Sequence, residues 1–150
     1  MKLNGNTIPL ESQEVEIPRS TGAIRFRVNA VSIGVRRDFD AVFPKPTVPL
    51  LITDSKNGRK SEENWHDPKF RKELDEREYL QNIYIVYRVL ANDPNVVFEN
   101  IPTDIPSLRL LAKEFSDSGL SEGDLLAILK QALKASNLTH EEIEAAKASF

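Results

Sequence analysis

The stretch DPKFRKELDEREYLQNIYIVYRVLAN, residues 67–92, decides the fold of this chain because it predicts one long helix. Asp67 and Pro68 make a good helix start, since an Asp side chain accepts hydrogen bonds from free N–H groups and Pro is tolerated in the first turn. Residues 69–78 are mostly charged, whereas residues 79–90 are apolar almost all the way round. Such a helix must be covered on every side, by its own domain or by a partner.

The sequence leaves two interpretations of this apolar half open. In the first, it is a core helix between the sheet and the C-terminal helices. In the second, a chain of this size cannot cover residues 79–90 alone, and the tyrosines belong to a binding surface. Tyrosine is favoured at such surfaces because its ring is apolar and its hydroxyl can remain in contact with water. Tyr84→Asp would then abolish binding without loss of helicity. The candidate partner-binding residues are Tyr79, Ile83, Tyr84, Tyr87 and Leu90, with Leu125, Leu129 and Ile143 as a second group.

The residues before this helix read as strands and turns. Asn4-Gly5 is a pair favoured in tight hairpin turns of the primed types. Residues 23–31 alternate apolar and polar side chains, which is typical of an antiparallel sheet with one buried face. A short helix is expected at residues 34–42 and a short strand at residues 48–53.

The residues after the long helix predict further helices. Val96-Val97-Phe98 is a short apolar run that suits a strand or a plug in the core. One helix is expected from about residue 104 to Gly119. Two more, at about 122–135 and 140–149, each begin with a capping box and a hydrophobic staple.

Together these elements predict an α+β fold with N-terminal antiparallel strands and a helical C-terminal part that has one long helix and three shorter ones. We divide the chain into a β-rich part, 1–53, a mobile polar loop, 54–66, and a helical part, 67–150. An exposed hairpin tip at Asn57-Gly58 is the alternative to a mobile loop. With 150 residues, the chain is one compact domain or a domain with a helical appendage.

Composition narrows the function classes. The net charge is −3 with acidic and basic residues nearly balanced, so no overall field attracts nucleic acid or an anionic membrane. The absence of cysteine removes disulfides, thiolate metal sites and thiol nucleophiles. Neither a signal peptide nor a run of about 18 apolar residues is present, so we expect a cytoplasmic protein without membrane spans.

The sequence offers no catalytic motif. His66 and His140 lack the neighbouring ligands that a metal site needs, and no phosphate-binding glycine loop or nucleophile motif occurs. We therefore expect no enzyme activity, cofactor or metal.

Nucleic-acid binding also has weak support. The last two predicted helices have helix-turn-helix dimensions, but Glu141, Glu142 and Glu144 at the start of the second would repel phosphates. A solvated sheet face is the better interpretation of the basic residues Arg25, Arg27, Arg36 and Arg37.

The order of these features resembles the tail assembly chaperones and related minor tail proteins of long-tailed bacteriophages. The residues that carry the resemblance are Met1–Leu10, Ile24–Val28, Asp67–Phe70 before the long helix, Asp93–Phe98, Leu120-Ser121 and Leu138-Thr139. The resemblance implies an assembly factor in the host cytoplasm that binds the helical, apolar tape-measure protein, keeps it soluble and helps recruit tail-tube subunits. The alternatives are a permanent structural tail or connector subunit, which would form a homo-oligomer, and a small DNA-binding regulator.

Overall fold

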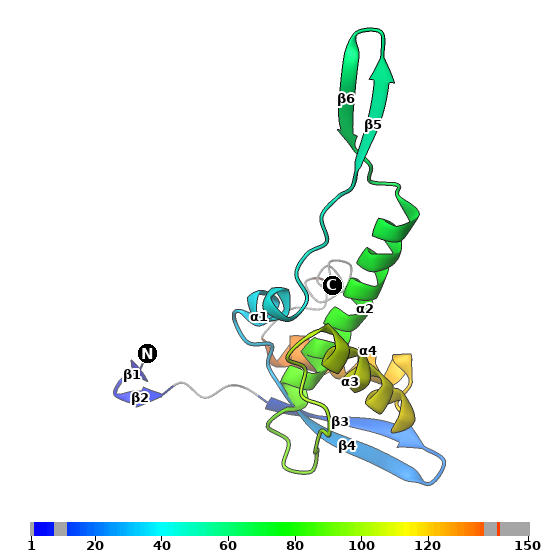
Figure 1. Cartoon of the computed structure of the whole chain (residues 1–150). Helices are drawn as coiled ribbons and strands as arrows, with labels where there is room; N and C mark the ends of the chain where they lie inside the picture. Colours follow the sequence, from blue (N-terminus) through cyan, green and yellow to red (C-terminus); the bar gives the residue numbers. More distant parts are fainter. Residues whose placement is uncertain (1, 8–11, 137–140, 142–150) are drawn as a thin grey trace.

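The chain has an α+β fold, and the computed structural model describes its residues 2–7, 12–136 and 141 (Figure 1). Antiparallel strand pairs come before a mainly helical part in which α2 is the longest helix. The predicted fold class is therefore confirmed. The elements are β1 (Lys2–Leu3), β2 (Asn6–Thr7), β3 (Ser12–Arg19), β4 (Gly22–Asn29), α1 (Val35–Val42), β5 (Leu50–Ser55), β6 (Gly58–Glu63), α2 (Pro68–Leu90), α3 (Ile105–Asp117) and α4 (Glu122–Ala135).

The first two hairpins follow the sequence pattern. The β1–β2 turn has φ angles of 51° at Asn4 and 80° at Gly5, and a type I′ turn needs positive values at both positions. In β3–β4, the side chains of Val15, Ile17 and Val28 are buried, while the residues between them face solvent. The predicted turn is confirmed, whereas the alternation predicted for residues 23–31 holds only in part, because Ile24 is 38% exposed and Asn29 is buried.

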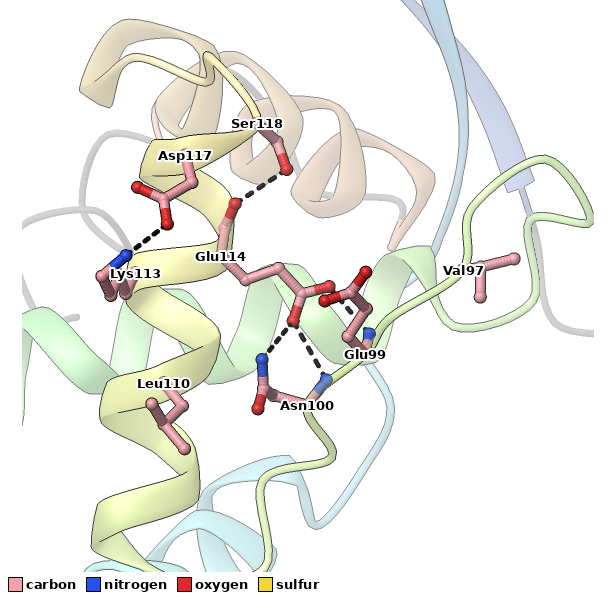
Figure 2. Close-up of a pocket in the computed structure, with 8 residues that line it drawn as sticks. All are labelled: Val97, Glu99, Asn100, Leu110, Lys113, Glu114, Asp117 and Ser118. Atoms are coloured by element: carbon pink, nitrogen blue, oxygen red, sulfur yellow. Dashed lines mark hydrogen bonds and ion pairs between the residues drawn. The ribbon is translucent and has the colours of Figure 1, made fainter.

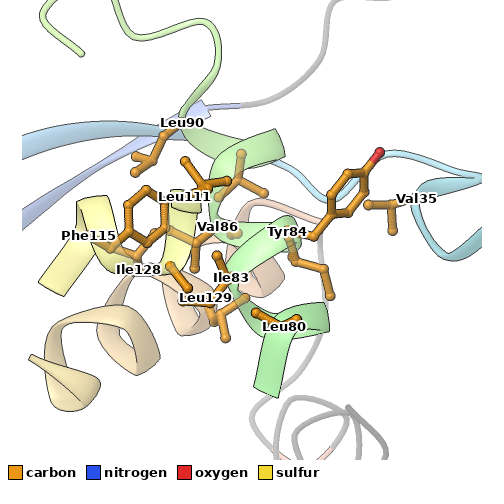
Figure 3. Close-up of a cluster of buried hydrophobic side chains, with 14 of the residues drawn as sticks. Val35, Leu80, Ile83, Tyr84, Val86, Leu90, Leu111, Phe115, Ile128 and Leu129 are labelled. Atoms are coloured by element: carbon orange, nitrogen blue, oxygen red, sulfur yellow. The ribbon is translucent and has the colours of Figure 1, made fainter. Parts of the chain in front are cut away.

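Helix α2 forms the centre of the molecule. The Asp67 carboxylate accepts a hydrogen bond from the Phe70 N–H at 2.9 Å, as the predicted cap requires. Helices α1, α3 and α4 and strand β4 all contact α2, so its apolar half runs through the core (Figures 1 and 3). In the described part of the chain, no helix combines the length and apolar character needed to cross a bilayer.

Helices α3 and α4 begin with the caps that their sequences encode. The Asp104 carboxylate accepts from the Ser107 N–H at 2.9 Å, and the Ser121 hydroxyl accepts from the Asp124 N–H at 3.2 Å. In each case the third helical residue bonds back to the cap, which completes a capping box. These two predicted helices are confirmed, whereas the one predicted at 140–149 lies almost entirely outside the described residues.

Strands β5 and β6 form a hairpin that we call the β5–β6 arm (residues 50–63). It projects from the body at the beginning of α2, away from the core (Figure 1). Of the two interpretations of residues 54–66, the hairpin agrees with the structure, and its turn lies at residues 56–57. The run 96–98 forms no strand; instead the Phe98 ring packs on Phe115 and Tyr87.

Candidate functional site

The structure places most of the predicted binding residues inside the core. Ile83, Tyr84, Leu90 and Leu129 are between 0% and 5% exposed, so the expectation that they face a partner is wrong. The physical reason is that three helices and a strand surround α2, which is enough to cover its apolar half within one copy (Figure 3). Tyr87 and Leu125 are partly buried, and Ile143 lies outside the described residues.

Tyr84 illustrates how a tyrosine is accommodated in this core. Its ring packs against Phe39 of α1 at 5.6 Å between centroids. Its hydroxyl accepts a hydrogen bond at 3.0 Å from Arg88, which also donates to the Asp38 carboxylate at 2.7 Å. That hydrogen bond from Arg88 lowers the pKa of Asp38. The polar end of Tyr84 is therefore satisfied internally and is not available to a partner.

Tyr79 behaves differently, because it is 52% exposed and borders a groove of about 330 Å³. The groove lies between α2, α3 and the start of α4, and we call it the Tyr79 groove. It unites three of the predicted residues, Tyr79, Ile83 and Leu125, although Ile83 reaches it only from the core. The lining is Tyr79, Ile83, Ala112, Phe115, Ser116, Leu120, Glu122 and Leu125.

Acidic side chains lie in and near the Tyr79 groove. Glu122 belongs to the lining, and the exposed Asp75 lies one helical turn before Tyr79. Glu76, also on α2, forms an ion pair with Arg109 of α3. The groove is thus mainly apolar, with Glu122 in its lining and Asp75 one helical turn from Tyr79. Such a groove suits the apolar face of a helix that carries basic residues beside that face.

A second apolar pocket, of about 240 Å³, adjoins the Tyr79 groove and shares Phe115 and Leu120 with it. The β4 residues Ile24 and Phe26 form one wall, and Val97, which is 85% exposed, belongs to the lining. Sequence reasoning missed this pocket. Its signal was the apolar run 96–98 between two helices, which we interpreted only as a strand or core plug.

A further pocket, of about 440 Å³, has a structural explanation (Figure 2). The Glu114 carboxylate accepts hydrogen bonds from the Glu99 N–H at 2.8 Å and from the Asn100 N–H at 3.0 Å. Burial alone would raise the pKa of Glu114, but these bonds outweigh it and the pKa is lowered. Lys113 pairs with Asp117 on the other side of the pocket. The Glu114 carboxylate thus fixes the loop between α2 and α3, while the Lys113–Asp117 pair lies within α3.

Of the four arginines of the basic patch, Arg36 and Arg37 lie on α1, whereas Arg25 and Arg27 lie on β4 opposite acids of β3. Arg25 lies opposite Glu16 in the strand register, with 3.9 Å between their charged atoms, and Arg27 lies opposite Glu14. Such cross-strand pairs stabilise a solvated sheet face. Among the described residues, no three His, Asp or Glu side chains gather in a way that could hold a metal ion.

Comparisons of the chain with protein-family models, with curated proteins and with solved structures found no match. The mainly apolar Tyr79 groove, with Glu122 in its lining, is the described feature best suited to bind another protein.

Proposed function

We propose that this protein is a non-enzymatic phage tail assembly factor, acting in the host cytoplasm, that binds an apolar helical partner such as the tape-measure protein and keeps it soluble. The observation that carries the proposal is the Tyr79 groove, where an exposed tyrosine borders an apolar depression next to Leu120 and Leu125. A partner helix would place its apolar stripe in the groove and basic residues beside Asp75 and Glu122. The adjoining pocket at Val97 extends the apolar surface.

The first test is the gene neighbourhood. A very long, coiled-coil-rich reading frame directly downstream supports the proposal and supplies the partner for the binding test. Co-expression with this chain should raise the soluble fraction of that partner, and the two should co-purify. A partner that is equally soluble alone would contradict the proposed role.

Point variants then locate the contact. Tyr79→Asp and Leu125→Asp should abolish co-purification, because a carboxylate in the groove opposes the burial of apolar surface. The matched control is Leu126→Asp, since Leu126 is the neighbour of Leu125 on α4, is 47% exposed and lies outside the groove lining. All three variants should retain the far-UV circular dichroism of the parent chain. Binding that survives at Tyr79→Asp and Leu125→Asp alike would remove the groove from consideration.

A further inference from the structure

The β5–β6 arm is a surface that the proposed function leaves unused. Every residue of its two strands is exposed. The side chains of Leu50, Leu51 and Ile52 are 60%, 52% and 57% exposed, although all three are large and apolar. A two-stranded hairpin that buries neither face is only marginally stable in water. The arm therefore gains stability when a further strand pairs with its edge and packs its own side chains beside these three.

The alternation of hydrogen-bonded and non-hydrogen-bonded pairs along the hairpin shows which backbone N–H and C=O groups are free to bond to such a strand. The Asn64 N–H donates to the Pro49 carbonyl at 2.7 Å, and this bond belongs to the same antiparallel register as the arm. Hydrogen-bonded and non-hydrogen-bonded pairs alternate along an antiparallel ladder. The β5 residues whose N–H and C=O groups point outward, away from β6, are therefore Leu50, Ile52 and Asp54.

The two edges of the arm differ in their side chains. Natural sheets usually protect an exposed edge with charges, proline or a bulge. Strand β5 has one charged residue, Asp54, beyond a block of three apolar ones. Four of the six residues of β6 are charged: Arg59, Lys60, Glu62 and Glu63. Only the β5 edge is thus suited to accept another strand.

We infer that β5 pairs antiparallel with β5 of a second copy of this chain, about a two-fold axis at Leu51. In this register Leu51 of one copy lies opposite Leu51 of the other copy. Leu50 of each copy lies opposite Ile52 of the other. The register centred on Ile52 would instead place Leu50 opposite Asp54. The Leu51 register satisfies the outward backbone groups of Leu50 and Ile52 and matches every large apolar side chain of β5 with another.

The product is a four-stranded sheet in the order β6–β5–β5–β6. An isologous contact of this kind is closed, because each copy uses the same patch. The apolar block lies at the centre, the charged β6 strands form the outer edges, and no like charges face each other across the axis. The contact goes beyond the proposed function, since it uses none of the residues of the Tyr79 groove.

Cysteine cross-linking tests the register, because the chain contains no cysteine of its own. Single variants Leu51→Cys, Ile52→Cys and Thr53→Cys are oxidised under identical conditions. Directly opposed residues of a non-hydrogen-bonded pair have Cα atoms about 4.5 Å apart, which lies within the range of about 4.4–6.8 Å that a disulfide spans. Leu51→Cys should form the covalent dimer at least tenfold faster than the other two. Faster cross-linking at position 52 or 53 would overturn the proposal.

Proline variants test the edge. The N–H groups of Ile52 and Ser61 both point away from the hairpin, Ile52 on the β5 edge and Ser61 on the β6 edge. Ile52→Pro should reduce the mass measured by sedimentation equilibrium from that of two copies to that of one. Ser61→Pro, the matched control, should leave the dimer intact, and so should Tyr79→Asp. Ile52→Lys, which blocks the edge by charge alone, should give the same loss as Ile52→Pro.

The proposal fails if the parent chain has the mass of a single copy over the full accessible concentration range. It also fails if Ser61→Pro dissociates the dimer as completely as Ile52→Pro while Ile52→Lys does not. An extended segment of another protein would then be the better occupant of the β5 edge. None of these outcomes depends on whether the Tyr79 groove binds a partner.

Discussion

Arg19 of β3 and Asp124 of α4 form a two-bond ion pair between residues that are 105 positions apart in the sequence. One of the two bonds joins Arg19 Nη1 to Asp124 Oδ1 at 3.3 Å. Asp124 also accepts from the Ser121 N–H at 2.8 Å, as part of the α4 capping box. The Arg19 hydrogen bond is the main cause that lowers the pKa of Asp124 from 3.8 to about 2. One carboxylate thus caps a helix and fastens it to the β3–β4 hairpin.

Asp124→Asn should lower the free energy of unfolding at pH 7 by about 1–2 kcal/mol, because the charged hydrogen bonds are lost. Because the pKa of Asp124 is lower in the folded than in the unfolded chain, its ionised carboxylate stabilises the fold at pH values above the unfolded-state pKa. This stabilisation disappears as the pH falls through the folded-state pKa. The difference between parent and variant should therefore shrink between about pH 4 and pH 2. Urea unfolding at several pH values measures it. The control is Asp117→Asn, which removes an exposed ion pair with Lys113 and should have little effect at pH 7.

Arg77 is a buried cation with three roles. Its Nε–H donates to the Phe43 carbonyl at 3.0 Å, its guanidinium lies 4.8 Å from the Phe39 ring centroid, and it pairs with Asp40. Arg77→Ala should reduce the free energy of unfolding by about 2–4 kcal/mol, since it leaves a buried carbonyl without its donor. Arg77→Lys should recover only part of this, because Lys lacks the planar fork. If Asp40→Asn cost as much as Arg77→Ala, the ion pair rather than the carbonyl bond would be decisive.

Glu114→Ala should loosen the loop between α2 and α3 without unfolding the domain. The amide protons of Glu99 and Asn100 both bond to the Glu114 carboxylate, so their hydrogen exchange should accelerate in the variant. Because the pKa of Glu114 is lowered, the same protection in the parent chain should persist at neutral pH and decline as the pH falls below about 4.5. Slow exchange at both amides in Glu114→Ala would show that the loop is held by other contacts.

Tyr84→Asp should unfold the protein, contrary to what the sequence suggested. Tyr84 is 5% exposed and its ring lies against Phe39, so a carboxylate there would be buried without a suitable partner. Tyr84→Phe keeps the ring and removes only the hydrogen bond from Arg88, which should cost about 1 kcal/mol. Thermal unfolding followed by far-UV circular dichroism compares the two. A folded Tyr84→Asp variant would restore this residue as a surface candidate.

Removal of the β5–β6 arm should leave the body folded. The arm is closed at its base by the bond from the Asn64 N–H to the Pro49 carbonyl, so two glycines can replace residues 50–63. Because the strand residues are all exposed, the midpoint of thermal unfolding should change by no more than a few degrees. A large decrease would mean that the arm contributes to the core.

Local signals in the sequence were sufficient for the turns and helix ends. Asn4-Gly5, Asp67-Pro68 and the Ser121 capping box each satisfy backbone groups within a few residues, so their conformation depends little on the rest of the chain. The short helix α1 and strand β4 also lie close to their predicted positions.

The candidate site was harder to predict because it depends on packing between distant segments. Tyr79 and Tyr84 are five positions apart, which places them on different sides of a helix with 3.6 residues per turn. Tyr84 is buried because α1 packs on its side of the helix, and the position of α1 is not encoded near Tyr84 in the sequence. Strand β6 was indicated only by the turn pair Asn57-Gly58, because its own sequence GRKSEE has no apolar alternation and is recognised as a strand through its pairing with β5.

The location of the single tryptophan has a practical consequence for spectroscopy. Trp65 lies between the arm and α2, is 52% exposed, donates to Glu63 at 3.1 Å and meets the Phe70 ring edge-on at 5.9 Å. The indole emission of this protein therefore reports on the joint at the base of the arm and hardly at all on the buried interior. On heating, tryptophan fluorescence would follow the loosening of the base of the arm, whereas calorimetry would follow the unfolding of the core.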